Sequence, residues 1–135
     1  MRTLTKLFAN IKNGQRAGKG MIKTPFSKCS IKILNLLFLE GFICGYGLSL
    51  RSPQLKKINQ PFIYILLKYK DSQPVIKNIK QISSSGCRVY KNVKSLQSHT
   101  RASFEFIILS TPKGIISHKT AISLNVGGEV LCKVI

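Results

Sequence analysis

Apolar side chains near the start of the chain recur at helical spacing. Positions i, i+3, i+4 and i+7 of one helical face are occupied by Leu4, Leu7, Phe8 and Ile11, the pattern of an amphipathic helix. We expect this helix to end at Asn13-Gly14, because glycine readily adopts the left-handed conformation that closes helices.

A second helix is predicted over residues 28–39. Ser27 is its candidate N-cap, because a serine hydroxyl can accept a hydrogen bond from the free amides of the first turn. Glu40-Gly41 is its expected end. The side chains expected to face the core are Ile31, Ile33, Leu34, Leu37 and Phe38.

Runs of β-branched and aromatic residues predict strands through the rest of the chain. The clearest covers residues 62–69, and a short one begins at Met21-Ile22. Further strands are expected at residues 42–48, 75–82, 87–91, 104–109 and 129–135, with short helices at 93–99 and 117–124. This order predicts an α+β fold in two halves, 1–82 and 83–135, separated by the serine- and glycine-rich loop at 83–86.

The charge balance points to a polyanionic partner. The chain has 22 Lys and Arg residues against 4 Asp and Glu residues, a formal net charge of +18, and residues 1–39 contain no acid. Such a surplus opposes compaction unless a polyanion offsets it, and nucleic acid releases counterions at each cation that it binds. An anionic membrane surface is the alternative partner, although no apolar run is long enough to span a bilayer. The first residues could also be a transit peptide, but their helical spacing favours the first helix of the fold.

The residues required for catalysis or metal binding are scarce. The four cysteines form no CxxC pair and only two histidines are present, which fits neither a zinc site nor a disulfide framework. We expect free thiols in apolar surroundings. Cys87 with His99 or His118 could form a thiolate–imidazole pair, but no catalytic motif surrounds it. The sequence therefore predicts no enzyme activity, no cofactor and no small-molecule substrate.

A turn after the strand at 104–109 carries groups suited to RNA. Ser110 and Thr111 offer hydroxyls, Lys113 offers a charge, and Gly114 allows close approach of the backbone to a phosphate or a ribose hydroxyl. The same residue types occur in ordinary turns, so the pattern alone also fits a turn without a ligand.

A solitary carboxylate follows two glycines near the end of the chain. Glu129, directly after Gly128, would be repelled by phosphates unless it accepts a hydrogen bond from a base amino group. The alternative is a charge partner for a neighbouring cation. Tyr90, in a segment with Arg88 and Lys91, could stack on an unpaired base or pack in the core.

Six segments in this order and spacing resemble one family across nearly the whole chain, the universal small-subunit ribosomal protein number eight (S-eight). They are LFANIKNGQ (Leu7–Gln15), SKCSIKILNLLFLEGFI (Ser27–Ile43), LLKY (Leu66–Tyr69), SGCRVYK (Ser85–Lys91), LSTPKGIIS (Leu109–Ser117) and VGGEVLCKV (Val126–Val134). The helix followed by EGFI and the pairing of STPKG with GGEVLC are the most specific of these.

The resemblance implies two small packed domains, the N-terminal one of αβαββ type and the C-terminal one mostly β with a short helix. It also implies a structural protein that binds the central domain of small-subunit rRNA directly, beside neighbouring small-subunit ribosomal proteins. The family's contacts, carried over residue by residue, fall on Ser110, Thr111, Lys113, Gly114, Gly128 and Glu129, with Arg88, Tyr90 and Lys91 in a matching segment. A second, backbone-directed contact falls on Asn13, Lys12 and Arg16.

Two features depart from the family pattern. Pro112 stands where a second serine is usual, which removes a hydroxyl and a backbone donor from the turn. The start, MRTLTK, lacks the usual acidic segment, and Ile and Lys are abundant relative to Val and Arg, as in products of AT-rich organellar genomes. We therefore expect a mitochondrial ribosome, ahead of a plastid or bacterial one.

Overall fold

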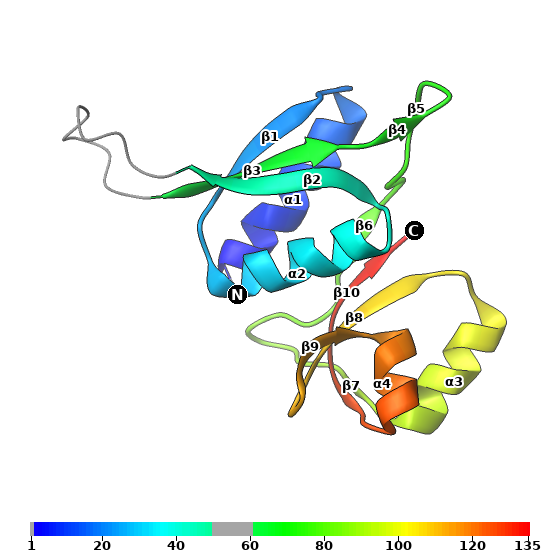
Figure 1. Ribbon diagram of the computed structural model, residues 1–135. Helices are drawn as coiled ribbons and strands as arrows, with labels where there is room; N and C mark the ends of the chain where they lie inside the picture. The colour runs from blue at the N-terminus through cyan, green and yellow to red at the C-terminus, as the bar shows by residue number, and fades with distance from the viewer. Residues whose placement is uncertain (1, 50–60) are drawn as a thin grey trace. The chain divides into compact units, whose positions relative to one another are not determined.

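The computed structural model describes residues 2–49 and 61–135, which form two compact units, 2–76 and 77–135 (Figure 1). Both units combine helices with antiparallel strands, so the predicted α+β class is confirmed. Residues 51–60, which the sequence predicts to be a polar, proline-containing connection, lie outside the described residues. None of the described helices is long and apolar enough to cross a membrane.

The first unit is a three-stranded sheet with two helices on one face (Figure 1). The strand order is β1-β3-β2, and both strand pairs are antiparallel. The core between sheet and helices includes Leu7, Ile11, Ile33, Ile63 and Ile65, all fully buried. Its elements are α1 (Arg2–Arg16), β1 (Met21–Pro25), α2 (Lys28–Leu39), β2 (Ile43–Ser49), β3 (Phe62–Leu67), β4 (Tyr69–Lys70) and β5 (Gln73–Pro74).

The apolar stripe of α1 is confirmed, since all four predicted side chains are buried. The helix does not end at Asn13-Gly14, however, but continues to Arg16. Gly14 is a packing residue instead, because a Cβ there would stand 2.6 Å from Ile22 Cγ2. The left-handed conformation that follows the helix belongs to Gly18, whose φ is +69°.

The second helix follows its prediction closely. Ser27 occupies the N-cap position without a side-chain capping bond, and Glu40 ends the helix before Gly41, whose φ is +80°. Phe38 was wrongly placed in the core. Phe38 is 46% exposed, because it lies at the edge of the buried face of α2. Its ring meets the Tyr46 ring of β2 edge-on, with the ring centroids 6.4 Å apart.

The second unit is a strongly β structure with two short helices. Its strands pair in the order β6-β10-β8-β9, with β7 also on β10. The core residues are Leu96, Ile107, Leu109, Ala121 and Val130. Its elements are β6 (Ile79–Gln81), β7 (Tyr90–Lys91), α3 (Val93–Ala102), β8 (Phe106–Thr111), β9 (Gly114–Ser117), α4 (His118–Leu124) and β10 (Gly128–Val134).

Two of the strands predicted for this unit are shorter in the structure, and one strand of the structure was not predicted. The expected strands at 75–82 and 87–91 shrink to β6 and β7, and strand β9 was missed. The sequence predicts a turn that ends at Gly114 and a helix from residue 117, with no element between them, yet Gly114–Ser117 pairs with β8 along its whole length. The division between units falls after residue 76, and β6, which was assigned to the first half, pairs with β10.

The cysteines are all free, but only one lies in apolar surroundings. Cys132 on β10 is fully buried, and burial raises the pKa of its thiol to about 12. The other three, Cys29, Cys44 and Cys87, are exposed, so the expectation of buried thiols is wrong for them. The two histidines are engaged elsewhere: His99 Nε2 lies 3.0 Å from Glu105, and His118 Nδ1 accepts from the Ile107 amide.

This difference predicts selective thiol labelling. Treating the native protein with iodoacetamide near pH 8 should modify Cys29, Cys44 and Cys87 while Cys132 stays unmodified, because alkylation needs an accessible thiolate. Denaturant should then add the fourth label. Intact-mass spectrometry counts the labels, and native labelling of Cys132 as fast as the others would contradict the burial described here.

Candidate nucleic-acid interface

The beginning of β10 lies between two other strands. Glu129 pairs with Ser110 of β8 on one side and with Tyr90 of β7 on the other. Directly opposed residues of antiparallel strands project to the same face of a sheet. Tyr90, Glu129 and Ser110 therefore form a single row across three strands, which we call the carboxylate row. The pairing unites sequence positions that are about twenty to forty residues apart.

Two glycines make this close pairing possible. A Cβ on Gly128 would stand 2.3 Å from the carbonyl oxygen of Ser110. A Cβ on Gly127 would stand 2.6 Å from the carbonyl oxygen of Lys91. In both cases the obstacle is backbone, which cannot rotate aside as a side chain can. The glycines thus bring β7 and β8 close to the carboxylate.

The turn between β8 and β9 presents Lys113 beside this row. The Thr111 hydroxyl donates to the Gly114 carbonyl at 2.9 Å and accepts from the Lys113 amide at 3.2 Å. Gly114 has φ +111°, a conformation that glycine adopts without strain. Pro112 occupies the first central position, where its fixed φ suits a turn. Thr111 is therefore occupied in holding the turn, while the Ser110 hydroxyl takes no part in these bonds.

The carboxylate of Glu129 is only partly paired. Its Oε2 lies 3.4 Å from an Arg88 guanidinium nitrogen, and the Glu129 side chain is 12% exposed. Its Oε1 is buried without a hydrogen-bond partner among the described residues. An unpaired buried acceptor carries a desolvation cost that a donor would remove. Glu129 is thus a charge partner of Arg88, one of the two roles weighed from the sequence, and the exposed 12% of its side chain is the part that an outside donor can reach.

The other acid of this unit is also held by cations. Glu105 Oε2 lies 3.0 Å from His99 Nε2 and 3.4 Å from Lys133 Nζ. Burial raises the pKa of Glu105, but the charges and hydrogen bonds of Lys133 and His99 outweigh burial and hold that pKa below its ordinary value. Both acids are therefore paired with cationic or imidazole side chains. Tyr90 of the row is 66% exposed, and Arg88 and Lys113 meet solvent beside the row.

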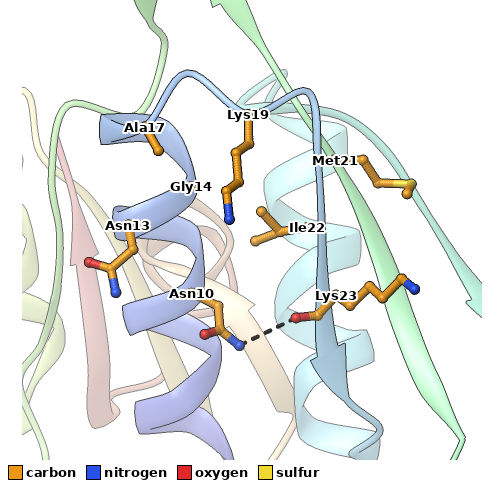
Figure 2. A pocket seen from close by; sticks show the side chains of 8 residues that line it. All are labelled: Asn10, Asn13, Gly14, Ala17, Lys19, Met21, Ile22 and Lys23. Carbon is orange, nitrogen blue, oxygen red and sulfur yellow. Dashed lines mark hydrogen bonds between the residues drawn. The ribbon is translucent and has the colours of Figure 1, made fainter.

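The second group of predicted residues lies in the first unit, at the end of α1. Figure 2 shows Asn13 and Lys19 in a pocket between α1 and β1, together with Asn10. Asn10 Nδ2 donates to the Lys23 carbonyl at 3.4 Å, which joins the helix to the strand. Lys12 and Arg16 do not line this pocket, although Lys12 is next to Asn13 in the chain and Arg16 lies three residues after Asn13, one helical turn along α1. Asn10, three residues before Asn13, was missed although helical spacing places the two amides on one side.

Polar bonds fix the end of α1 against the chain that follows β3. The buried Gln15 donates to the Lys68 carbonyl at 3.5 Å and accepts from the Ile76 amide at 3.3 Å. The Tyr69 hydroxyl lies 2.6 Å from the Lys19 carbonyl. These bonds hold the pocket residues in a defined place. Within residues 2–49 and 61–135, no cluster of three His, Cys, Asp or Glu side chains could hold a metal ion.

Comparison with known proteins matches nearly the whole chain to a single family. A family described as "Ribosomal protein S8" matches residues 2–135. "Small ribosomal subunit protein uS8" of Paramagnetospirillum magneticum is 40% identical over 97% of this chain and 95% of its own length. The protein of the same name from Ruegeria pomeroyi is 42% identical over 95% and 94%. That of Caulobacter vibrioides is 40% identical over 97% and 95%.

The glycine that precedes Glu129 generates a stability prediction. Gly128→Ala should lower the free energy of unfolding by about 1–3 kcal/mol, because the new methyl group pushes against the Ser110 backbone. Gly86→Ala is the matched control, since nothing lies within 4 Å of its Cβ position, and it should change stability by less than about 0.5 kcal/mol. Urea unfolding measures both. Equal effects of the two substitutions would show that the approach of β10 to β8 is not close.

Proposed function

The chain belongs to the ribosomal protein S8 family, and we propose that it binds the rRNA of the small subunit directly through the carboxylate row and the adjoining turn. The family and its relatives support a structural role in the small ribosomal subunit. The central domain of that rRNA is the proposed partner, with neighbouring small-subunit proteins around it. This is the finer assignment that the family resemblance implied.

The observation that carries the proposal is the partly paired carboxylate of Glu129 in a basic environment. A regular A-form duplex hides its bases in a deep, narrow groove, so sequence-specific proteins read distorted or unpaired nucleotides. A carboxylate oxygen accepts a hydrogen bond from a base amino group, whereas a phosphate, which offers only acceptor oxygens, repels it. Glu129 is set between Tyr90 and Ser110, which offer a ring for stacking and a hydroxyl for a ribose or base edge.

The cations beside the row supply affinity and register. Lys113 is exposed at the tip of the turn, where its ammonium can reach a phosphate oxygen. At Gly114 nothing lies within 4 Å of the position of the missing Cβ, so the backbone of the turn is open to close approach, whereas Gly128 acts by letting β10 lie against Ser110. Lys91 and Arg88 are proposed to contact phosphates, and Arg88 also pairs with Glu129. Contacts to phosphate position a protein on RNA without reading its sequence. Choice among sequences therefore falls to Glu129 and Ser110, with Thr111 acting through the shape of the turn.

A second contact is proposed for the exit of α1. Asn13 and Lys19 face one pocket with Asn10, a set that suits a ribose–phosphate segment, because amides donate to phosphate oxygens and a lysine offsets their charge. Lys12 and Arg16 stand one helical turn apart on α1 and are proposed to contact backbone phosphates beside that pocket.

A ribosome of bacterial type is the proposed location. The relatives reported above are proteins of bacteria, and they lend no support to the mitochondrial origin expected from the start of the chain and its lysine and isoleucine content.

Removing the lysine of the turn should weaken RNA binding in a salt-dependent way. Lys113→Ala is expected to reduce the slope of log K against log salt by about 1, the share of one phosphate. Filter binding to a fragment of the small-subunit rRNA central domain, repeated at several salt concentrations, measures this slope. Lys80→Ala is the control. Lys80 lies on β6, which pairs with the opposite end of β10, so this substitution should leave the slope unchanged. The same slope in both variants would remove Lys113 from the interface.

Neutralising the carboxylate should alter choice rather than affinity for phosphate. Glu129→Gln keeps the size of the side chain but offers an amide where an acceptor stood. The preference for the cognate hairpin over hairpins altered at single bases should fall by roughly 1–3 kcal/mol at one position. Competition binding at fixed salt measures this preference. Unaltered discrimination, with folding verified by circular dichroism, would exclude a base-reading role for Glu129.

A further inference from the structure

The three-stranded sheet of the first unit has an outer face that its helices do not cover. On β3 the buried residues Ile63 and Ile65 alternate with Phe62, Tyr64 and Leu66, which project to the opposite face. Figure 1 shows α1 and α2 together on one side of this sheet. By strand register, the outer face also holds Met21, Lys23 and Pro25 from β1, and Gly45, Gly47 and Ser49 from β2.

This outer face is apolar where a solvent-facing sheet is usually polar. Antiparallel sheets with one face in water alternate apolar and polar residues, yet the outward positions of β3 are Phe62, Tyr64 and Leu66. Leu66 is 45% exposed and Met21 beside it is 47% exposed. Contiguous exposed apolar surface on a soluble protein marks an interaction site. The face therefore needs a partner.

The polar groups of the face indicate what kind of partner it takes. The ammonium of Lys23 lies 5.1 Å from the Phe62 ring centroid and 5.7 Å from that of Tyr64. The two rings meet edge-on with centroids 5.1 Å apart. In Figure 2 the Lys23 side chain points away from α1, although its carbonyl bonds to Asn10. No acid stands among the described residues of this face, so a lysine and two aromatic rings face solvent together.

The neighbouring strand leaves space for a flat group. Gly47 is opposite Tyr64, and nothing lies within 4 Å of the position of its missing Cβ. Gly45 is opposite Leu66 and meets only a leucine methyl group at 3.8 Å. A planar ring placed on Tyr64 can therefore extend over β2 without meeting a side chain. Aromatic rings on a sheet, with a cation for the backbone, form the arrangement that stacks unpaired bases.

We propose that this surface, the aromatic sheet face (Lys23, Phe62, Tyr64, Gly45 and Gly47), stacks unpaired bases of RNA while Lys23 contacts the adjoining phosphate. The inference rests on the proposed function, since it takes RNA as the partner of the chain, but it assigns a separate surface in the first unit. Charge complementarity favours RNA over a protein: Lys23 is the one charged side chain among the described residues of the face, and the chain has a net charge of +18. A stacked base also needs the faces of aromatic rings, whereas the apolar side chains of a protein partner could pack on any apolar surface.

A single tryptophan tests this proposal directly. The chain contains no tryptophan, so Tyr64→Trp introduces the only indole, and a stacked base quenches indole fluorescence. Oligoadenylate should quench this variant, whereas inorganic polyphosphate, which has charge but no bases, should not. Phe38→Trp is the matched control, because Phe38 is an exposed aromatic on α2, and neither polymer should quench it. Phe62→Trp repeats the measurement if the first variant does not fold.

The affinity of the face gives a second readout. Tyr64→Leu keeps an apolar side chain but removes the ring, and should weaken binding of oligoadenylate by roughly 5- to 100-fold. Tyr64→Phe should bind like the natural protein. The loss in the leucine variant should persist at high salt, because stacking is not an ionic contact.

Three results would overturn the proposal. Quenching by polyphosphate as strong as by oligoadenylate would mean that charge alone is sensed. The same affinity for the leucine and natural proteins would exclude stacking. An indole whose fluorescence is unchanged by RNA, but which becomes shielded from acrylamide quenching in assembled small subunits, would mean that a protein covers the face. Failure of the turn in the second unit is distinguishable, because Lys113→Ala would then leave hairpin binding unchanged while Tyr64→Trp still responds to oligoadenylate.

Discussion

The approach of β10 to β8 at Gly128 is the constraint on which the candidate interface depends. The missing side chain at this position lets two backbones lie so close that even a methyl group would collide with the Ser110 carbonyl. Only with that approach does Glu129 reach the same row as Tyr90 and Ser110. The adjoining glycine does the same against β7. Recognition chemistry is thus assembled by strand pairing, and the helices of this unit contribute its core.

Electrostatics explain why one carboxylate matters in so basic a chain. With a net charge of +18, phosphate contacts are available over much of the surface, and such contacts do not discriminate between sequences. Discrimination needs a group that phosphate repels and a base amino group satisfies. Glu129 has this property because its Arg88 partner occupies one oxygen and leaves the other unpaired. In the proposed function, the cations hold RNA near the surface and the carboxylate limits which RNA fits.

The sequence predicted best where local pattern and tertiary structure agree. The stripe of α1, the end of α2 at Glu40 and the strand at β3 follow from spacing, capping and composition. Errors arose where packing overrides local preference. Gly14 is predicted as a helix end, but it packs the helix against Ile22. No strand is predicted between the turn at 110–114 and the helix at 117–124, but Gly114–Ser117 pairs with β8. No local signal reports which strand a short segment will join.

The candidate site shows the same division between what local pattern predicts and what tertiary packing decides. Ser110, Lys113 and Glu129 were expected together, and strand register brings Ser110 opposite Glu129 with Lys113 in the adjoining turn. The internal bonding of Thr111 could not be anticipated, because it depends on the exact turn geometry. Nor could the uncovered face of the first sheet, since alternation along β3 gives apolar residues on both sides and does not say which side the helices take.

Ultraviolet cross-linking of the protein to its small-subunit rRNA fragment, followed by mass spectrometry of the peptides, tests the central claim most directly. The account predicts cross-links in peptides that contain Tyr90, Lys113 and Glu129, because these residues lie on neighbouring strands and their connecting turn. Cross-links confined to other parts of residues 77–135, with these three peptides unmodified, would contradict it.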